Sequence, residues 1–161
     1  MFDSKSVKNE FLNTVNKMKK IALFIIILIS SVSFSQEWKT SLEEAKQVAI
    51  KENKKILLVF SGSDWCAPCM KLEKNVWQSE VFKKEATEKY VLLKADFPKK
   101  KGNQLSNELT ENNNKLAERY NKDGNFPLVV MLDKNGKVQG MTGFKNVSAD
   151  NYIKLLNSLE K

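Results

Sequence analysis

A short segment at residues 55–60 (KILLVF) is apolar without a break after its first residue, Lys55, and ends at the sequence Ser-Gly-Ser. Alternating apolar and polar residues are typical of a strand with one solvated face, whereas a short continuous run is typical of a strand that is buried on both faces. Such a strand needs other strands beside it and helices on either side of the sheet. The run therefore predicts the central strand of a layered α/β domain.

The rest of the pattern alternates between helical and strand-like segments. A capping-box sequence at residues 41–44 predicts that the first helix begins there. In chain order, the predicted elements are a helix to about residue 53, the strand at 55–60, helical segments at 70–73 and after Ser79, a strand at 90–96, a helix at 109–120, a strand at 126–132, its hairpin partner at 137–142 and a helix after Ser148. This order predicts a mixed β-sheet with helices on both faces.

The N-terminal part of the chain has the layout of a secretory signal peptide. From Met18 onwards, two lysines precede an apolar run at residues 21–29, and the small residues Ser33 and Ser35 precede Gln36. The run is shorter than the roughly 20 residues of a membrane-spanning helix, so no stable membrane anchor is expected after processing. We expect residues 1–35 to be an N-terminal extension and signal peptide, and residues 36–161 to be one domain of an exported bacterial protein, periplasmic or secreted.

The charge of the chain gives little sign of a nucleic-acid partner. The net charge is +8, and the first 35 residues carry five lysines and two acidic residues, which leaves +5 for residues 36–161. Acidic residues are interspersed nearly everywhere, so this surplus is typical of a solvated surface, and no nucleic-acid partner is expected. The exception is the run KKK at residues 99–101, which predicts an exposed loop and leaves open a docking role for an acidic partner.

The chain has only two cysteines, Cys66 and Cys69, and three interpretations of them can be compared. A structural disulfide that closes so short a loop removes only about 2 kcal/mol of unfolded-state entropy, against about 4.7 kcal/mol for a hundred-residue loop. A metal site needs about four ligands, and with no histidine and no further cysteine in the chain only an intermolecular site could be completed. A redox-reactive pair is therefore favoured, and this chemistry requires no metal and no cofactor.

The position of the pair predicts a different role for each sulfur. The cysteines follow the buried strand and come just before a helix, so Cys66 is expected at the helix N-terminus, where unpaired N–H groups and the helix dipole stabilise a thiolate. Cys66 is then the nucleophile that attacks a partner disulfide, and Cys69 resolves the mixed disulfide. Pro68 falls in the first helical turn, where its missing N–H costs least. Trp65, directly before the nucleophile, is expected to cover one side of the sulfur and to contact substrate.

The motif Trp65-Cys66-Ala67-Pro68-Cys69 resembles the active site of the thioredoxin superfamily, and Asn125-Phe126-Pro127 is similar to its cis-proline loop. The resemblance extends over most of residues 36–161 and is greatest to exported thioredoxin-like proteins similar to the periplasmic C-terminal domain of membrane disulfide-reducing proteins. It implies a thioredoxin fold and an exported thiol–disulfide oxidoreductase that reduces or isomerises protein disulfides. It also implies that Ala67 and Pro68 support the motif, that Phe126 and Pro127 bind substrate, and that a membrane-borne donor supplies electrons.

The chain departs from the thioredoxin pattern at three places. Val59 and Phe60 stand where thioredoxins carry a buried acid, and Leu92 stands near the position of its lysine partner. No buried general base can therefore be assigned, and the proton of Cys69 would pass to water, to Asp64 or to the partner. Leu128 follows the proline in place of the usual threonine, which puts the substrate preference in doubt.

Three other functions remain open at this point. The same fold could serve as a redox-inactive binding or chaperone module, or as an oxidase of protein thiols. A third possibility is a peroxide-consuming or haem-maturation enzyme of the same superfamily. A peroxidase usually carries an arginine near its cysteine, whereas the only arginine here, Arg119, is far from both cysteines in the sequence.

Overall fold

The structure is a computed structural model that describes Thr14, Lys17 and residues 36–159. The chain divides into two units, Met1–Ser35 and Gln36–Lys161. The signal peptide predicted within residues 1–35 lies outside the described residues, apart from Thr14 and Lys17, and remains a prediction. Among the described residues, no helix is both long enough and apolar enough to cross a membrane.

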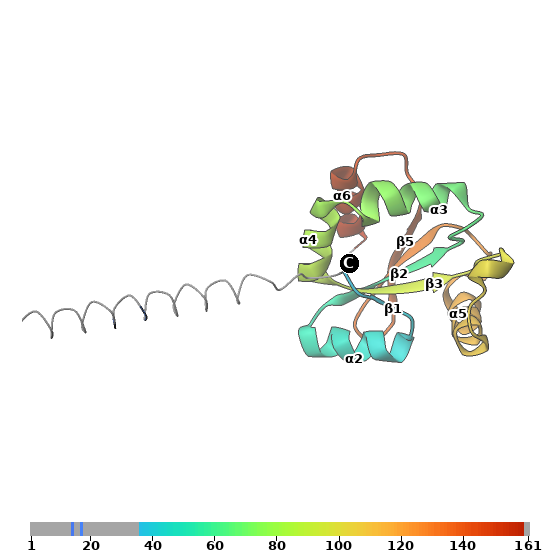
Figure 1. Cartoon of the computed structure of the whole chain (residues 1–161), viewed down its shortest axis with the longest axis horizontal. Helices are drawn as coiled ribbons and strands as arrows, with labels where there is room; N and C mark the ends of the chain where they lie inside the picture. The colour runs from blue at the N-terminus through green and yellow to red at the C-terminus, as the bar shows by residue number, and fades with distance from the viewer. Residues whose placement is uncertain (1–13, 15–16, 18–35, 160–161) are drawn as a thin grey trace, which may run out of the picture. The chain divides into compact units, whose positions relative to one another are not determined.

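The second unit is built around a five-stranded mixed sheet with the order β1-β3-β2-β4-β5 (Figure 1). The strands are β1 (Trp38–Lys39), β2 (Lys55–Ser61), β3 (Tyr90–Asp96), β4 (Leu128–Leu132) and β5 (Val138–Gly143). β3 is parallel to both β1 and β2, whereas β4 is antiparallel to β2 and to β5. β2, the strand predicted from the apolar run, is central, which confirms the predicted mixed sheet.

Five α-helices and two shorter helical segments complete the unit. They are α2 (Leu42–Glu52), α3 (Ala67–Leu72), the π-helical segment η1 (Glu73–Trp77), α4 (Glu80–Lys89), the 3-10 segment η2 (Lys101–Asn103), α5 (Asn107–Tyr120) and α6 (Ala149–Ser158). Four of the α-helices begin after a serine whose side chain accepts a backbone N–H from the first turn, which satisfies an otherwise unpaired donor: Ser41, Ser79, Ser106 and Ser148.

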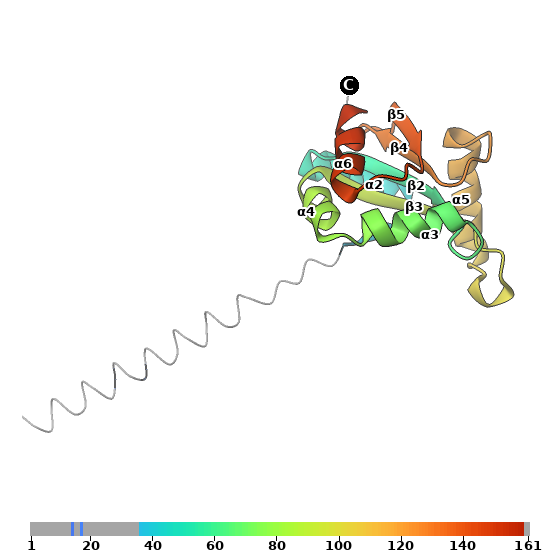
Figure 2. The ribbon, with the colours of Figure 1, turned by 90° about the horizontal axis from the view of Figure 1, so that it is seen from above.

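The helices form a layer on each face of the sheet (Figures 1 and 2). Leu57 and Val59 of β2 pack with residues of α3, η1, α4 and α6, whereas Ile56, Leu58 and Phe60 pack with residues of α2 and α5. Successive side chains of a strand point to opposite faces, so an unbroken apolar run supplies both cores. This arrangement confirms that β2 is buried on both faces.

Three differences from the predicted elements concern the sheet and the active-site helix. The two-residue strand β1 was not predicted because so short a segment has no recognisable period; it pairs Trp38 with Leu92 at the edge of the sheet. η1 continues α3 as a π-helix. β4 begins at Leu128, two residues later than expected, because the Phe126–Pro127 segment forms the loop in front of the strand.

Candidate active site

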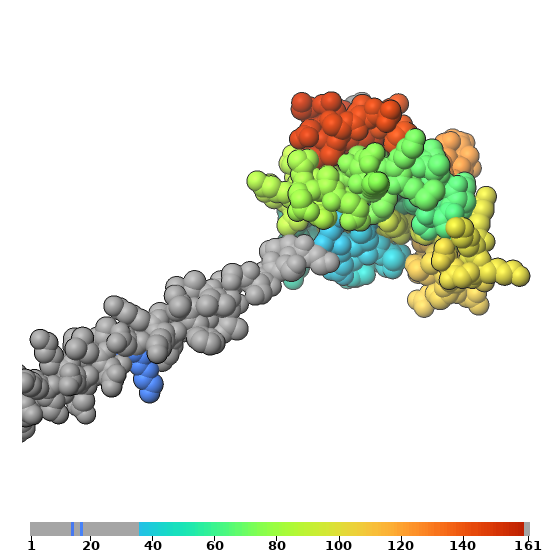
Figure 3. Space-filling view, turned by 45° about the horizontal axis from the view of Figure 1, so that its top comes forward, coloured from blue at the N-terminus to red at the C-terminus, as the bar shows by residue number. Residues whose placement is uncertain are grey.

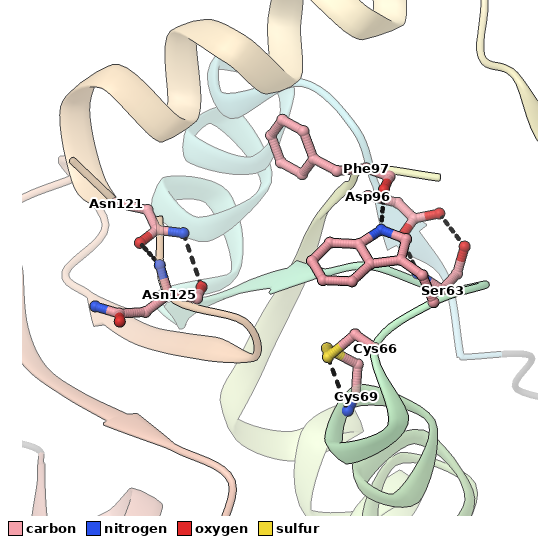
Figure 4. The surroundings of a disulfide bond; sticks show 8 residues. Ser63, Cys66, Cys69, Asp96, Phe97, Asn121 and Asn125 are labelled. Atoms are coloured by element: carbon pink, nitrogen blue, oxygen red, sulfur yellow. Dashed lines mark hydrogen bonds between the residues drawn. A yellow bond between two sulfur atoms is a disulfide. The ribbon is translucent and has the colours of Figure 1, made fainter. Parts of the chain in front are cut away.

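Both cysteines lie where β2 passes into α3 (Figure 4). Cys66 is the N-cap of α3, and its Sγ accepts a hydrogen bond from the backbone N–H of Cys69 at 3.2 Å. The two sulfurs form a disulfide, and the residues are 4% and 3% exposed. The prediction that Cys66 stands at a helix N-terminus is therefore confirmed, with Pro68 in the first turn as expected.

Trp65 is fixed by contacts with the loop that follows β3. Its indole Nε1 donates a hydrogen bond to the carbonyl oxygen of Phe97 at 2.7 Å, and its ring makes an edge contact with Phe126 at 5.4 Å between centroids. A Cβ atom at Gly62 would lie 2.3 Å from the indole, so this packing requires a glycine there. The side chain is still 38% exposed, so one surface of Trp65 remains open to a partner.

Two acidic side chains hold the turn before Cys66 to the strand and loop beside it. The carboxylate of Asp96, at the end of β3, accepts hydrogen bonds from the backbone N–H and the hydroxyl of Ser63 at 2.9 and 2.5 Å. The carboxylate of Asp64 accepts the backbone N–H groups of Lys99 and Lys100, both at 2.9 Å. These contacts join two consecutive residues of the active-site turn to β3 and its following loop: Ser63 is bonded to the end of the strand and Asp64 to the loop.

Asp64 is not the mobile carboxylate that the sequence left open as a proton acceptor for Cys69. Its two oxygens accept three hydrogen bonds, the third from the side chain of Asn103 at 3.0 Å. The backbone N–H of Lys99 contributes most to holding the pKa of Asp64 below its usual value. Asp64 is therefore fixed to the loop after β3, and it does not line the cavity of about 410 Å³ that contains Cys69.

The Phe126–Pro127 peptide bond is cis, as the resemblance implied. The loop before it is closed by a reciprocal pair of hydrogen bonds, in which the Asn125 N–H donates to Asn121 Oδ1 at 2.8 Å and Asn121 Nδ2 donates to the Asn125 carbonyl at 2.9 Å (Figure 4). A groove of about 470 Å³ is lined by Pro68 of α3, by Phe126 and Pro127 of this loop, and by residues of β5. The active-site helix and the cis-proline loop therefore share one surface.

The buried acid of thioredoxins has no counterpart in β2, as the sequence indicated. Val59 and Phe60 are buried in the two opposite cores. The position paired with Val59 on β3 is instead Lys94, whose Nζ lies 2.9 Å from Oε2 of Glu73. The other oxygen of Glu73 accepts a hydrogen bond from Gln78 at 2.7 Å.

Glu73 and Lys94 line the same cavity as Cys69. The cavity has a volume of about 410 Å³, and the ion-paired side chains are partly buried, at 35% and 26% exposed. Glu73 comes four residues after Cys69 in a continuous helical run, so the two side chains lie on one face. Sequence reasoning missed Glu73, although the four-residue spacing from the second cysteine was a usable signal. Within the part of the chain that the structure describes, no group of three or more Cys, Asp or Glu side chains could hold a metal ion.

Comparisons with known proteins agree with this geometry. A family model described as thioredoxin-like matches residues 37–134. The disulfide bond reductase DsbH of Chlamydia pneumoniae is 33% identical over 125 residues, which cover 78% of this chain and 73% of that protein. A solved structure described as a DsbH oxidoreductase has a TM-score of 0.71 at 32% identity and covers 78% of this chain and 84% of its own.

A solved structure with a lower sequence identity to this chain shares its fold. The solution structure of a thioredoxin from Thermus thermophilus has a TM-score of 0.58 at 16% identity and covers 78% of this chain and 88% of that one. At this identity the likeness concerns the fold alone. Together with the family match over residues 37–134, these findings show that the chain has a thioredoxin fold and belongs to the thioredoxin-like family.

Proposed function

We propose that this thiol–disulfide oxidoreductase acts as an exported reductase or isomerase of protein disulfides, with Cys66 and Cys69 as its redox pair. The observation that carries the proposal is the oxidised Cys66–Cys69 pair at the start of α3, beside a cis-proline loop. Its similarity to a protein named disulfide bond reductase supports the reducing direction.

The first step of the proposed reaction uses Cys66. In the reduced protein, the helix N-terminus and the backbone N–H of Cys69 favour the Cys66 thiolate. This thiolate attacks one sulfur of a client disulfide, forms a Cys66–client disulfide and displaces the other client sulfur as a thiolate, which takes up a proton from water. Trp65, Phe126 and Pro127 contact the client in this complex, at the exposed side of the indole and along the groove of about 470 Å³.

The second step uses Cys69. Its thiol loses a proton and attacks the Sγ of Cys66, which closes the Cys66–Cys69 disulfide and releases the second client thiolate. Two electrons have then passed from the protein to the client. Glu73 takes the proton from Cys69, either directly or through water in the cavity of about 410 Å³ that they share. The ammonium of Lys94, 2.9 Å from Oε2, holds the Glu73 carboxylate in place beside this cavity.

A redox titration tests the function and its direction together. There is no histidine between the cysteines to stabilise a thiolate further, so we expect the reduced form to be less favoured than in a strong oxidant. We expect a midpoint below roughly −200 mV, nearer to the value of about −270 mV for thioredoxin than to the value of about −120 mV for the strong oxidant DsbA. The measurement is equilibration of the purified protein in glutathione buffers with quantification of free thiols.

Each alternative gives a different outcome in the same titration. A midpoint near −120 mV would indicate an oxidase of protein thiols. Cysteines that do not exchange with glutathione at any ratio would indicate a redox-inactive binding module. Either result would overturn the proposed reductase while leaving the fold intact.

Export is the second part of the proposal and rests on the signal-peptide pattern of residues 18–35. A reductase outside the cytoplasm lies beyond the reach of cytosolic thiol pools, so a membrane-borne electron donor is required. We expect the exported protein to begin near Gln36, as measured by mass spectrometry of the protein recovered outside the cytoplasm. Exported protein that retains residues 1–35 would contradict this processing.

A further inference from the structure

The loop between β3 and α5, residues 97–106, carries the three consecutive lysines and lies directly beside the active-site turn. Asp64 accepts the backbone N–H groups of Lys99 and Lys100, and Trp65 donates to the carbonyl of Phe97. The two residues that precede Cys66 therefore hold this segment, which we call the lysine loop. Figure 3 shows it projecting from the surface next to the start of α3. Its position relative to the reactive sulfur is fixed by the fold.

A cavity of about 650 Å³ lies between the lysine loop, α5 and the active-site turn. Its volume is within the range of about 300–1,000 Å³ that is typical of ligand sites. Trp65, Phe97, Phe126 and Leu105 give it an apolar lining. Phe126 makes edge contacts with both other aromatic rings, at 5.4 Å each, so the three rings form one continuous aromatic surface.

The wall of this cavity also contains a polar group without a partner. Asn113 of α5 lines the cavity and is 1% exposed. Its Nδ2 donates to the carbonyl of Asp96 at 2.8 Å, but among the residues that the structure describes its Oδ1 has no hydrogen-bond partner. Buried polar atoms are usually paired, so an unpaired acceptor on a residue that lines the cavity suits a ligand that carries a hydrogen-bond donor. An aromatic side chain with a hydroxyl or an indole N–H combines such a donor with a ring that suits the lining.

The rim of the cavity is positively charged. The side chains of Lys99, Lys100 and Lys101 are exposed, and within residues 36–159 none of them forms a salt bridge. The Lys99 ammonium lies 3.9 Å from the centroid of the Trp65 ring, at the edge of the cavity. The nearby carboxylate of Asp64 accepts hydrogen bonds from the loop backbone, and that of Asp96 accepts them from Ser63. The free positive charges therefore suit an acidic segment on a partner.

We propose that the cavity and the lysine loop form a second client-binding subsite, which takes an aromatic side chain flanked by aspartate or glutamate near the reacting disulfide. Phe126 lines both this cavity and the groove at the cis-proline, so a client segment lying in that groove can reach the subsite. The inference rests on the proposed function, because the occupant is a segment of a disulfide-containing client. The subsite gives the protein a preference for clients whose segment beside Trp65 contains acidic and aromatic residues.

The test compares the reduction of three disulfide-bonded peptides of equal length. The first carries tyrosine between two glutamates, the second has lysines in place of the glutamates, and the third has alanine in place of the tyrosine. We expect the wild-type protein to reduce the first peptide with a kcat/KM about tenfold above either of the others at low salt. The preference over the lysine peptide should shrink in 0.5 M salt (about three times the physiological ionic strength), because the Debye length falls well below its physiological value of about 8 Å.

Matched variants separate the effect of the lysine loop on substrate preference from the effect of the protein's net charge. The double variant Lys100→Gln/Lys101→Gln should lose most of the preference for the glutamate peptide. The control variant Lys51→Gln/Lys154→Gln changes the net charge equally at exposed positions on α2 and α6 and should keep the preference. Gln104→Trp places a ring at the cavity wall and should remove the preference for tyrosine over alanine.

A small neutral disulfide, bis(2-hydroxyethyl) disulfide, reports the thiol chemistry separately. If the wild-type protein reduces this compound but reduces the three peptides equally, the subsite is wrong and the proposed function stands. If the lysine-loop variant slows the small disulfide as much as the glutamate peptide, the subsite is also wrong. If the wild-type protein reduces neither the compound nor the peptides, the proposed function fails and the subsite fails with it.

Discussion

Replacing Cys69 with serine should convert the protein into a trap for its clients. In the Cys69→Ser variant, Cys66 still attacks a client disulfide, but nothing resolves the mixed disulfide that forms. We expect Cys69→Ser to accumulate covalent client complexes and Cys66→Ser to accumulate almost none. Non-reducing gel electrophoresis of cells that express each variant, followed by mass spectrometry of the trapped proteins, measures the difference.

The reason for the asymmetry is the position of the two residues on one helix. Cys66 is the N-cap of α3, where its Sγ accepts the Cys69 N–H, whereas Cys69 lies within the first turn and faces the cavity of Glu73 and Lys94. A sulfur at the helix N-terminus has a lowered thiol pKa and is the better nucleophile at neutral pH. Both single variants should lose turnover of insulin disulfides to the background rate, because each lacks one half of the dithiol.

Three observations would contradict this assignment. Equal trapping by the two variants would mean that either sulfur can start the reaction. Preferential alkylation of Cys69 in the reduced wild-type protein at neutral pH would mean that Cys69 is the nucleophile. The double variant Cys66→Ser/Cys69→Ser should trap nothing, and complexes seen with it would not come from the active site.

Replacing Glu73 with glutamine should slow the resolving step by about a hundredfold at pH 7. A positioned proton acceptor is worth roughly 10²–10⁴-fold in rate, and Glu73 is the carboxylate that shares a cavity with Cys69. Glutamine keeps the size and the hydrogen-bonding shape of the side chain but cannot take up the proton. In a single turnover with a disulfide peptide, stopped by rapid acid quenching, the mixed disulfide should appear and persist in Glu73→Gln.

The pH dependence distinguishes a proton acceptor from a residue that only supports the structure. Without Glu73, resolution depends on direct ionisation of the Cys69 thiol, which becomes easier as the pH rises. The deficit of Glu73→Gln should therefore shrink with rising pH, whereas the first step keeps its wild-type rate. A variant that is slower by the same factor at every pH would show that Glu73 acts only through packing.

A matched control for this experiment lies on α4. Glu80→Gln also removes a helical carboxylate from an ion pair, here with Lys83 at 2.8 Å, at a site outside the cavity lined by Cys69. We expect its resolving step and its pH profile to equal those of the wild-type protein. Transient accumulation of mixed disulfide in Glu80→Gln would mean that the effect comes from loss of charge anywhere on the surface.

Local sequence patterns were sufficient for the layers of the fold and for the reactive pair. The apolar run of β2 required helices on both faces, and Ser41, Ser79 and Ser148 marked the starts of α2, α4 and α6. The placement of Cys66 at the start of α3 followed from a buried strand that ends just before the two cysteines. These features depend on neighbours within a few residues, because hydrogen bonding in caps and the periods of helix and strand are local properties.

The surroundings of the two sulfurs depend on contacts between residues that are far apart in the sequence. The Glu73–Lys94 pair joins residues on a helix and on a strand, and it exists because the register of β2 with β3 sets Lys94 opposite Val59. The sequence left Asp64 open as a proton acceptor for Cys69, but in the folded chain its carboxylate binds the lysine loop and lies outside the cavity of Cys69. Residues 21 to 36 positions apart meet in these contacts. The periods of helix and strand in the sequence cannot predict these contacts. They depend on strand register and on the path of a loop, which are fixed when the whole sheet assembles.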